Sequence, residues 1–149
     1  MAPPPQEAYP VREALAEMNN TMANILVIDD ERGLREIARQ ALERAGHTVA
    51  EAADGRMAMD MLGRVVPDLI ITDILMPEQE GLQTIREIRK RWTSVPVLAV
   101  SGGGRTARLD FLEMARELGA NATLAKPFRV RELLAAVDQL LEVGKSPEP

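Results

Sequence analysis

The chain has 149 residues, of which 46% are hydrophobic and 28% are charged, which is typical of one globular domain with short tails. It contains no cysteine and one histidine, so disulfides, thiolate metal sites, cysteine nucleophiles and multi-histidine metal clusters are excluded. The net charge of −5 argues mildly against a surface that binds nucleic acid.

The first 22 residues differ from the rest of the chain. They begin with the proline-rich stretch MAPPPQEAYP, which lacks the basic and then hydrophobic pattern of a signal peptide. No apolar run reaches the roughly 18 residues that would cross a bilayer, so we expect a cytoplasmic protein without a membrane partner. Val11, Leu15 and Met18 share one helical face, so residues 1–22 are expected to be a flexible extension or to form a short helix around 10–19.

Five short runs with strand character follow this extension. Three of them are almost continuously apolar, which is typical of strands that are covered on both faces in a parallel sheet. The run that begins at His47 is weaker, and His47 itself is expected to lie in a surface turn without a phosphohistidine role. In chain order, the expected strands are 24–29, 47–52, 68–73, 95–100 and 121–126.

Helical segments alternate with these strands, because their apolar residues recur at spacings of three and four. The expected helices are 32–45, 55–64, 82–91, 105–118 and 129–142. Gly46 and Gly119 fall where the glycine of a helix C-cap belongs. Strands and helices that alternate in this way predict an α/β fold, in which right-handed crossovers place helices on both faces of one parallel sheet.

Polar side chains gather at the carboxyl ends of the expected strands, where ligand sites lie in open α/β sheets. One aspartate there can simply cap a helix or close a strand. Several acids, a hydroxyl and a lysine at one edge fit that explanation poorly. These residues are Asp29, Asp30 and Glu31 after the first strand, Asp73 at the end of the third, Ser101 after the fourth and Lys126 at the end of the fifth.

This combination of side chains points to phosphoryl transfer. Two carboxylates about 4 Å apart repel by roughly 4 kcal/mol at an effective dielectric near 20, so the acids need a cation among them. Hard oxygen ligands without histidine or cysteine suit Mg²⁺ or Mn²⁺. Lys126 and Ser101 can each contact a phosphoryl oxygen, and Asp73 is then placed to act as a nucleophile that forms an aspartyl-phosphate.

The stretches VIDDE, DLIITDILMPEQEGL, AVSGGG and TLAKPF resemble, in order and spacing, the motifs of the response-regulator receiver domain of two-component signalling. The resemblance covers roughly residues 23–143 and leaves 144–149 as a C-terminal tail. It implies a flavodoxin-like (βα)5 fold, which is a doubly wound five-stranded parallel sheet in a three-layer α/β/α arrangement.

The resemblance also implies roles for the residues at the sheet edge. Asp73 would be the phosphoacceptor, Ser101 the switch hydroxyl and Lys126 the phosphoryl contact, followed by a cis bond to Pro127. The implied ligands of Mg²⁺ (or Mn²⁺) are Asp30, Asp73, the backbone carbonyl of Leu75 and, usually through water, Asp29.

A protein of this kind signals rather than acts as a conventional enzyme, although it assists its own phosphorylation and dephosphorylation. The phosphoryl group would come from a phosphohistidine on a histidine kinase or a histidine phosphotransfer protein. Because only GKSPEP follows the last expected helix, we expect a single-domain regulator. It would act through phosphorylation-dependent binding of another protein or through an onward phosphorelay, and not through nucleic acid.

Two other functions compete with this interpretation. An aspartyl-phosphate phosphatase of the haloacid-dehalogenase type needs an acid two residues after its nucleophile, where this chain has Leu75. A nucleotide- or flavin-binding module could share the sheet topology, but the acidic edge would repel a phosphate unless a metal is present.

The chain departs from the receiver pattern on the fifth strand, where Thr123 replaces the usual aromatic residue. The resemblance therefore does not extend to the usual aromatic readout of phosphorylation. Glycine has broad backbone freedom, so we expect residues 102–104 to act as a hinge that repositions the start of the following helix.

Overall fold

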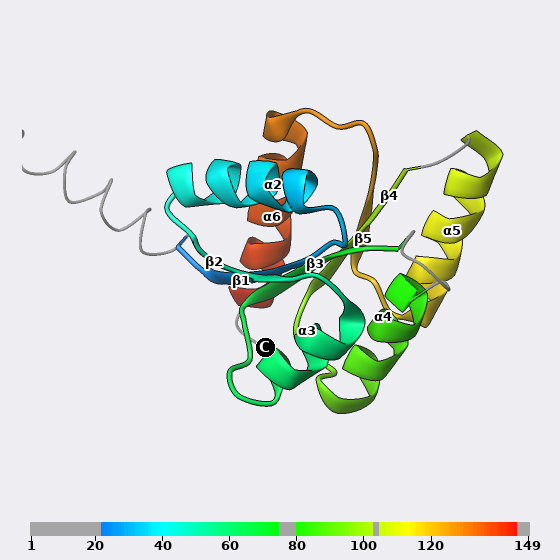
Figure 1. Cartoon of the computed structure of the whole chain (residues 1–149), viewed down its shortest axis with the longest axis horizontal. Coiled ribbons are helices and arrows are strands. Elements are labelled where there is room, and N and C mark those ends of the chain that lie inside the picture. The colour runs from blue at the N-terminus through cyan, green and yellow to red at the C-terminus, as the bar shows by residue number, and fades with distance from the viewer. Residues whose placement is uncertain (1–21, 75–79, 103–104, 146–149) are drawn as a thin grey trace, which may run out of the picture.

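The computed structural model describes residues 22–74, 80–102 and 105–145, in which strands and helices alternate along the chain (Figure 1). The strands are β1 (Asn24–Ile28), β2 (Thr48–Ala52), β3 (Leu69–Asp73), β4 (Val97–Ser101) and β5 (Ala122–Ala125). The helices are α2 (Arg32–Arg44), α3 (Gly55–Leu62), α4 (Glu80–Arg91), α5 (Arg105–Leu118) and α6 (Val130–Lys145). Every expected strand and helix of residues 24–142 is present, and the largest shift is at the end of α6.

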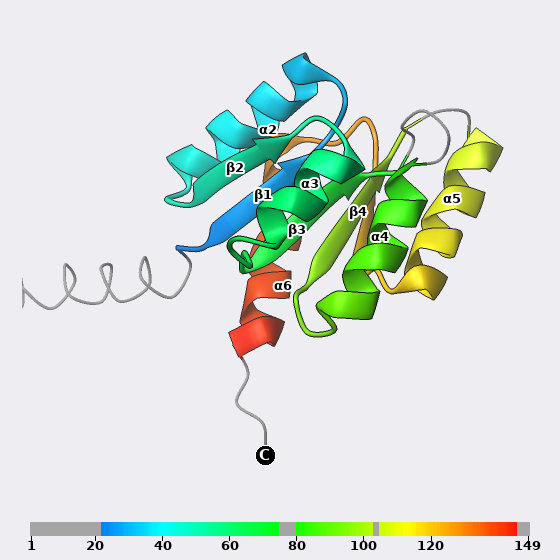
Figure 2. The ribbon, with the colours of Figure 1, turned by 60° about the horizontal axis from the view of Figure 1, so that its bottom comes forward.

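The five strands form one parallel sheet in the order β2-β1-β3-β4-β5 (Figure 2). The order reverses at β1, since β2 lies on one side of it and β3 on the other. The helices consequently cover both faces, with α2 and α6 on one face and α3, α4 and α5 on the other (Figure 1). The prediction of a flavodoxin-like, doubly wound sheet in three layers is confirmed.

The sheet separates two apolar cores, one under each layer of helices. Ile70 and Val97 pack against α3, α4 and α5, whereas Ile71 and Leu98 pack against α2 and α6. Every residue of the central strands β3 and β4 is buried, which explains why both read as continuous apolar runs. The edge strand β2 alternates between exposed and partly buried residues before its buried last residue, Ala52, and its run in the sequence is correspondingly weaker.

His47 does not lie in the exposed turn that the sequence suggested. Its side chain is buried, and its Nδ1 accepts a hydrogen bond of 3.1 Å from the backbone N–H of Ala23. The histidine thereby joins the chain just before β1 to the chain just before β2. A structural role is retained, but at a buried position.

Both glycines that were expected to end helices have the left-handed backbone that glycine favours, with φ of +102° at Gly46 and +122° at Gly119. At Gly119 the space for a side chain is also taken by Arg89. The Arg89 guanidinium donates to the backbone carbonyls of Gly119 (2.8 Å) and Trp92 (2.9 Å) and to Oδ1 of Asn121. Arg89 therefore ties the ends of α4 and α5 to the residue before β5.

Gly119→Ala should lower the free energy of unfolding by about 1–3 kcal/mol, because alanine is strained at this φ and its Cβ would overlap Arg89. The matched control is Gly33→Ala in α2, where a Cβ would meet no heavy atom within 4 Å. The control should gain roughly 0.5–1 kcal/mol in stability, because alanine favours a helix. Urea unfolding measures both, and a neutral Gly119→Ala would contradict the expectation.

Candidate functional site

Four strands end at one edge of the sheet and bring chemically active side chains together there. Asp29 directly follows β1, Asp73 is the last residue of β3, Ser101 is the last residue of β4, and Lys126 directly follows β5. Because β1 and β3 are neighbours whose following helices lie on opposite faces of the sheet, this edge is the topological switch point at which α/β sheets bind ligands.

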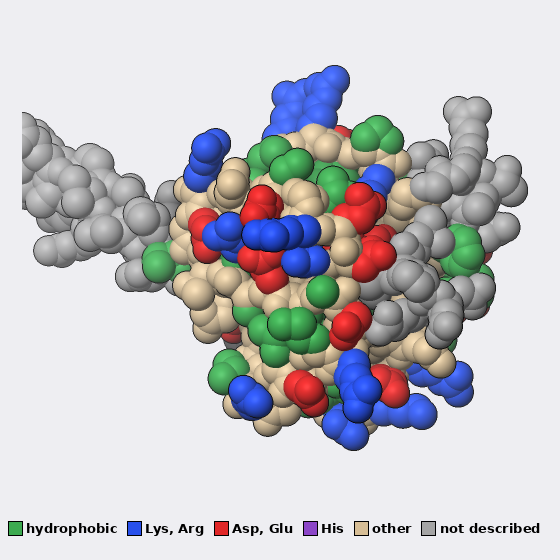
Figure 3. Space-filling view, viewed as in Figure 1, with side chains coloured by type: hydrophobic (Ala, Val, Ile, Leu, Met, Phe, Trp, Pro, Cys, Tyr) green, Lys and Arg blue, Asp and Glu red, His purple; other side chains and the backbone are tan. Residues whose placement is uncertain are grey.

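Three carboxylates form a compact acidic group at this edge. Asp29, Asp30 and Asp73 each offer an oxygen, and these oxygens all lie within 4.8 Å of one another. Asp29 and Asp73 are buried, whereas Asp30 is exposed. Figure 3 shows acidic side chains gathered on this side of the molecule, beside α2. A set of hard oxygen donors with one open side fits Mg²⁺ or Mn²⁺, which keep several waters and take few protein ligands.

Two further residues were predicted to belong to this region, Leu75 and Glu31. The carbonyl of Leu75 lies outside the described residues, so its proposed part in metal binding stays a prediction. Glu31 is exposed and precedes α2 as its N-cap residue, and its backbone N–H donates to Oδ1 of Asp29 at 2.9 Å. Its carboxylate is not part of the acidic group, and it is the backbone of Glu31 that supports Asp29.

Lys126 supplies the positive charge that faces the acidic group. Its Nζ lies 3.2 Å from Oδ2 of Asp29 and 3.5 Å from Oδ2 of Asp73. Burial acts to lower the pKa of Lys126, but the charges of Asp73 and Asp29 and their hydrogen bonds outweigh burial and raise this pKa above its usual value. Lys126 is therefore protonated at neutral pH. The bond from Lys126 to Pro127 is cis, as the resemblance implied.

Ser101 lies on the strand between those of Asp73 and Lys126. Its side chain is fully buried, and its Oγ donates to the carbonyl of Gly102 at 3.3 Å. Its own carbonyl accepts from the backbone N–H of Lys126 at 2.8 Å. Gly103 and Gly104, the other residues of the expected hinge, lie outside the described residues.

A pocket of about 500 Å³ opens beside the carboxylates. Asp29, Asp73 and Lys126 line it together with apolar side chains of the central strands, of α2 and of the segment around the start of α6, among them Leu34 and Phe128. A small reacting group can thus approach the acidic group from the surface.

Sequence reasoning missed Arg35, which lies close to this group. Its Nη1 donates to the backbone carbonyl of Asp29 at 2.7 Å. The one signal in the sequence is an arginine about one turn inside the helix that follows the acids. That signal is too common among surface helices to have identified the residue.

Comparisons with known proteins agree with the geometry. A family model described as the response regulator receiver domain matches residues 25–138. The response regulator MprA of Mycolicibacterium vanbaalenii is 39% identical over 119 residues, which are 78% of this chain and 49% of that protein. The MprA of Mycobacterium avium is 39% identical over 123 residues, or 81% and 52% of the two chains. The chain thus spans about half the length of the curated relatives it matches.

Solved structures share the fold. NtrX from Brucella abortus superposes with a TM-score of 0.78 at 30% identity, covering 83% of this chain and 28% of that one. The receiver domain of the Francisella response regulator 1452 has a TM-score of 0.72 at 25% identity and covers 83% and 99% of the two chains. None of the helices in the described part of the chain has the length and apolarity of a membrane span.

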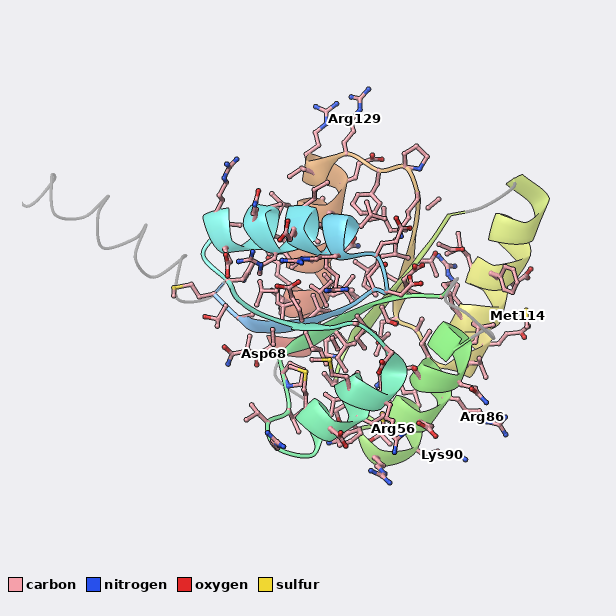
Figure 4. The ribbon with its side chains drawn as sticks, viewed as in Figure 1. Arg56, Asp68, Arg86, Lys90, Met114 and Arg129 are labelled. Atoms are coloured by element: carbon pink, nitrogen blue, oxygen red, sulfur yellow. The ribbon has the colours of Figure 1, made fainter. Side chains whose placement is uncertain are left out.

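Lys126→Met should lower the free energy of unfolding at pH 7 by about 2 kcal/mol in metal-free buffer, because two buried carboxylates lose their counter-charge. Lys90→Met is the control, since Lys90 projects from α4 into solvent (Figure 4) and should change stability by at most about 0.5 kcal/mol.

The same pair of proteins gives a test of pH dependence. A raised pKa means that the stability contributed by Lys126 is complete below the pKa of an unfolded lysine, about 10.4, and is lost as the pH rises through the higher pKa of the folded state. The difference in stability between the wild type and Lys126→Met should therefore stay constant from about pH 7 to 9 and shrink above about pH 10.4. A difference that grows in alkali would contradict this assignment.

Proposed function

Because the chain belongs to the response regulator receiver domain family, a family of two-component signalling, we propose that it accepts a phosphoryl group on Asp73 from a partner phosphohistidine. The observation that carries the proposal is a buried carboxylate at the end of β3, with Lys126 3.5 Å away and two further carboxylates beside it. The proposed donor is a histidine kinase or a histidine phosphotransfer protein.

In the proposed reaction, a carboxylate oxygen of Asp73 attacks phosphorus while the bond from phosphorus to the donor imidazole breaks. The bonding electrons leave with the imidazole nitrogen, and an aspartyl-phosphate remains on Asp73. The Lys126 ammonium group, which is paired with Asp29 and Asp73 before the reaction, would then also pair with a phosphoryl oxygen. The Ser101 hydroxyl would turn from the carbonyl of Gly102 to donate to another phosphoryl oxygen.

The residues at this edge fit a divalent cation, and we propose Mg²⁺ (or Mn²⁺) held by Asp30, Asp73 and the Leu75 carbonyl, with Asp29 acting through water. When bound, such an ion neutralises charge that would otherwise keep a phosphoryl group away from the carboxylates. Support for it comes from the acidic group itself, whose three carboxylates each offer an oxygen within 4.8 Å of the others.

The output of the proposed reaction is a change in protein binding or an onward phosphorelay, and not turnover of a substrate. We propose residues 23–143 as the receiver unit, with 1–22 and 144–149 outside it. The family match favours this function over a phosphatase or a nucleotide-binding module. Thr123 on β5 is partly buried, and its Oγ1 lies 3.5 Å from the Arg116 guanidinium. The chain therefore has no aromatic ring at this position that could change its orientation on phosphorylation.

Asp73→Asn should abolish phosphate incorporation from acetyl phosphate in the presence of Mg²⁺, because an amide is neutral and a poor nucleophile. Intact-mass spectrometry measures the adduct of one phosphate. The matched control is Asp68→Asn at the opposite end of the same strand (Figure 4), where the Asp68 carboxylate accepts from the backbone of Asn24 at 2.8 Å. The control should label like the wild type, and labelling of Asp73→Asn at an unchanged rate would refute the assignment.

Removal of divalent metal with EDTA should stop phosphorylation of the wild type without unfolding it. The reason is that repulsion among Asp29, Asp30 and Asp73 then lacks the compensating charge of the ion. Restoring Mg²⁺ should restore labelling, and circular dichroism should remain the same throughout. Phosphotransfer that continues without metal would show that the acidic group does not bind a catalytically required ion.

A further inference from the structure

The peptide group between Asp29 and Asp30 lies where the chain leaves the sheet. The N–H of Asp29 donates to the carbonyl of Ala52 at 3.1 Å, at the end of the pairing of β1 with β2. The carbonyl of Asp29 instead accepts from Nη1 of Arg35 at 2.7 Å. Because a peptide unit is planar, a bond that fixes this carbonyl also fixes the direction in which the chain enters Asp30.

Arg35 is itself held in a defined position by Glu51 on β2. Nε of Arg35 lies 3.2 Å from Oε1 of Glu51, and the Arg35 side chain is only 14% exposed. The donors of a guanidinium lie in one rigid plane, so the bond to Glu51 orients the Nη1–H that reaches Asp29. Figure 3 shows basic and acidic side chains alternating over this part of α2 and β2.

The side chain of Asp29 is anchored independently of Arg35. Its Oδ1 accepts from the N–H of Glu31 at 2.9 Å and its Oδ2 lies 3.2 Å from Nζ of Lys126. Asp30 differs, because it is exposed and the direction of its carboxylate depends on the backbone from which it projects. The bond from Arg35 is thus positioned to act on Asp30 more than on Asp29.

We propose that Arg35, oriented by Glu51, is a positioning residue for the divalent cation: it fixes the Asp29–Asp30 peptide group and so aims the carboxylate of Asp30 at the ion. This inference rests on the proposed metal site and adds to it two residues that touch neither metal nor phosphate. Partners of this kind, one shell outside the ligands, orient the ligands and affect how tightly a metal is held.

The sign of the effect separates positioning from simple electrostatics. Arg35 is a cation near a cation site, so an effect of its charge alone would oppose Mg²⁺, and its removal would strengthen binding. Removal of a positioning residue weakens binding instead. Arg39 offers a matched control, because its Nε lies 2.9 Å from Oε2 of the same Glu51 and its Nη1 lies 3.4 Å from Glu43.

The experiment measures the Kd for Mg²⁺ by calorimetric titration of the full chain, without any phosphoryl donor. Arg35→Met should raise the Kd by about tenfold or more. Arg35→Lys should recover part of this loss, because an ammonium group can still donate a hydrogen bond towards Asp29 but lacks the planar fork that joins Glu51 to Asp29. Arg39→Met removes a cation from the same acid and should leave the Kd within about twofold of the wild type.

Three outcomes would overturn the proposal: Arg35→Met that binds Mg²⁺ as tightly as the wild type, Arg35→Met that binds it more tightly, or Arg39→Met that loses as much affinity as Arg35→Met. Circular dichroism verifies folding. If Arg35→Met does not fold, Glu51→Gln tests the same idea with the arginine retained and should show a smaller loss of affinity.

Asp30→Asn separates the proposal from its premise. If Asp30→Asn abolishes Mg²⁺ binding and Arg35→Met does not weaken it, the inference about Arg35 alone is wrong. If Asp30→Asn binds Mg²⁺ like the wild type, the proposed metal site is wrong, and the role of Arg35 falls with it.

Discussion

Repulsion between two buried carboxylates is the constraint on which the rest of this edge depends. Asp29 directly follows β1 and Asp73 ends the neighbouring strand β3, so the sheet holds both buried residues side by side. Lys126 balances part of this repulsion from the end of β5, which lies three strand positions away from β1. It forms ion pairs with both carboxylates, and its pair with Asp29 joins residues that are 97 apart in the chain. The same charges raise the pKa of Lys126 against the effect of burial. The fold thus holds negative charge in excess where a cation and a phosphoryl group are proposed to bind.

The burial of Asp29 and Asp73 strengthens these interactions. A charge at a buried position experiences a lower effective dielectric, so it has a larger effect than it would in water. The pocket beside the acids receives apolar side chains from α2 and from the segment that leads into α6. α2 and α6 contribute to one lining because both helices lie on the same face of the sheet, whereas α4 lies on the other face. Topology and electrostatics therefore lead to the same location for the chemistry.

Local signals in the sequence predicted the strands, the helices and the edge at which the acids meet. The central strands could be predicted because burial on both faces leaves an uninterrupted apolar run, as in β3. Features that depend on a residue far away in the chain could not be predicted from the sequence. His47 was expected at the surface, and its burial follows from the pairing of β1 with β2, which brings the N–H of Ala23 to its ring. The contacts of Arg35 were missed for the same reason, since they form only when α2 lies beside both Glu51 and the end of β1.

The bonds of Arg89 have a mechanical consequence for the opposite end of the molecule. This guanidinium joins the C-terminal ends of α4 and α5 through the carbonyls of Trp92 and Gly119, whereas the N-terminal ends of both helices follow the strands that carry Asp73 and Ser101. Each helix is therefore pinned at the end far from the acids. A displacement that starts at the acids would rotate α4 and α5 about their C-terminal ends. Its amplitude would be largest at the N-terminal end of each helix and would fall towards Arg89.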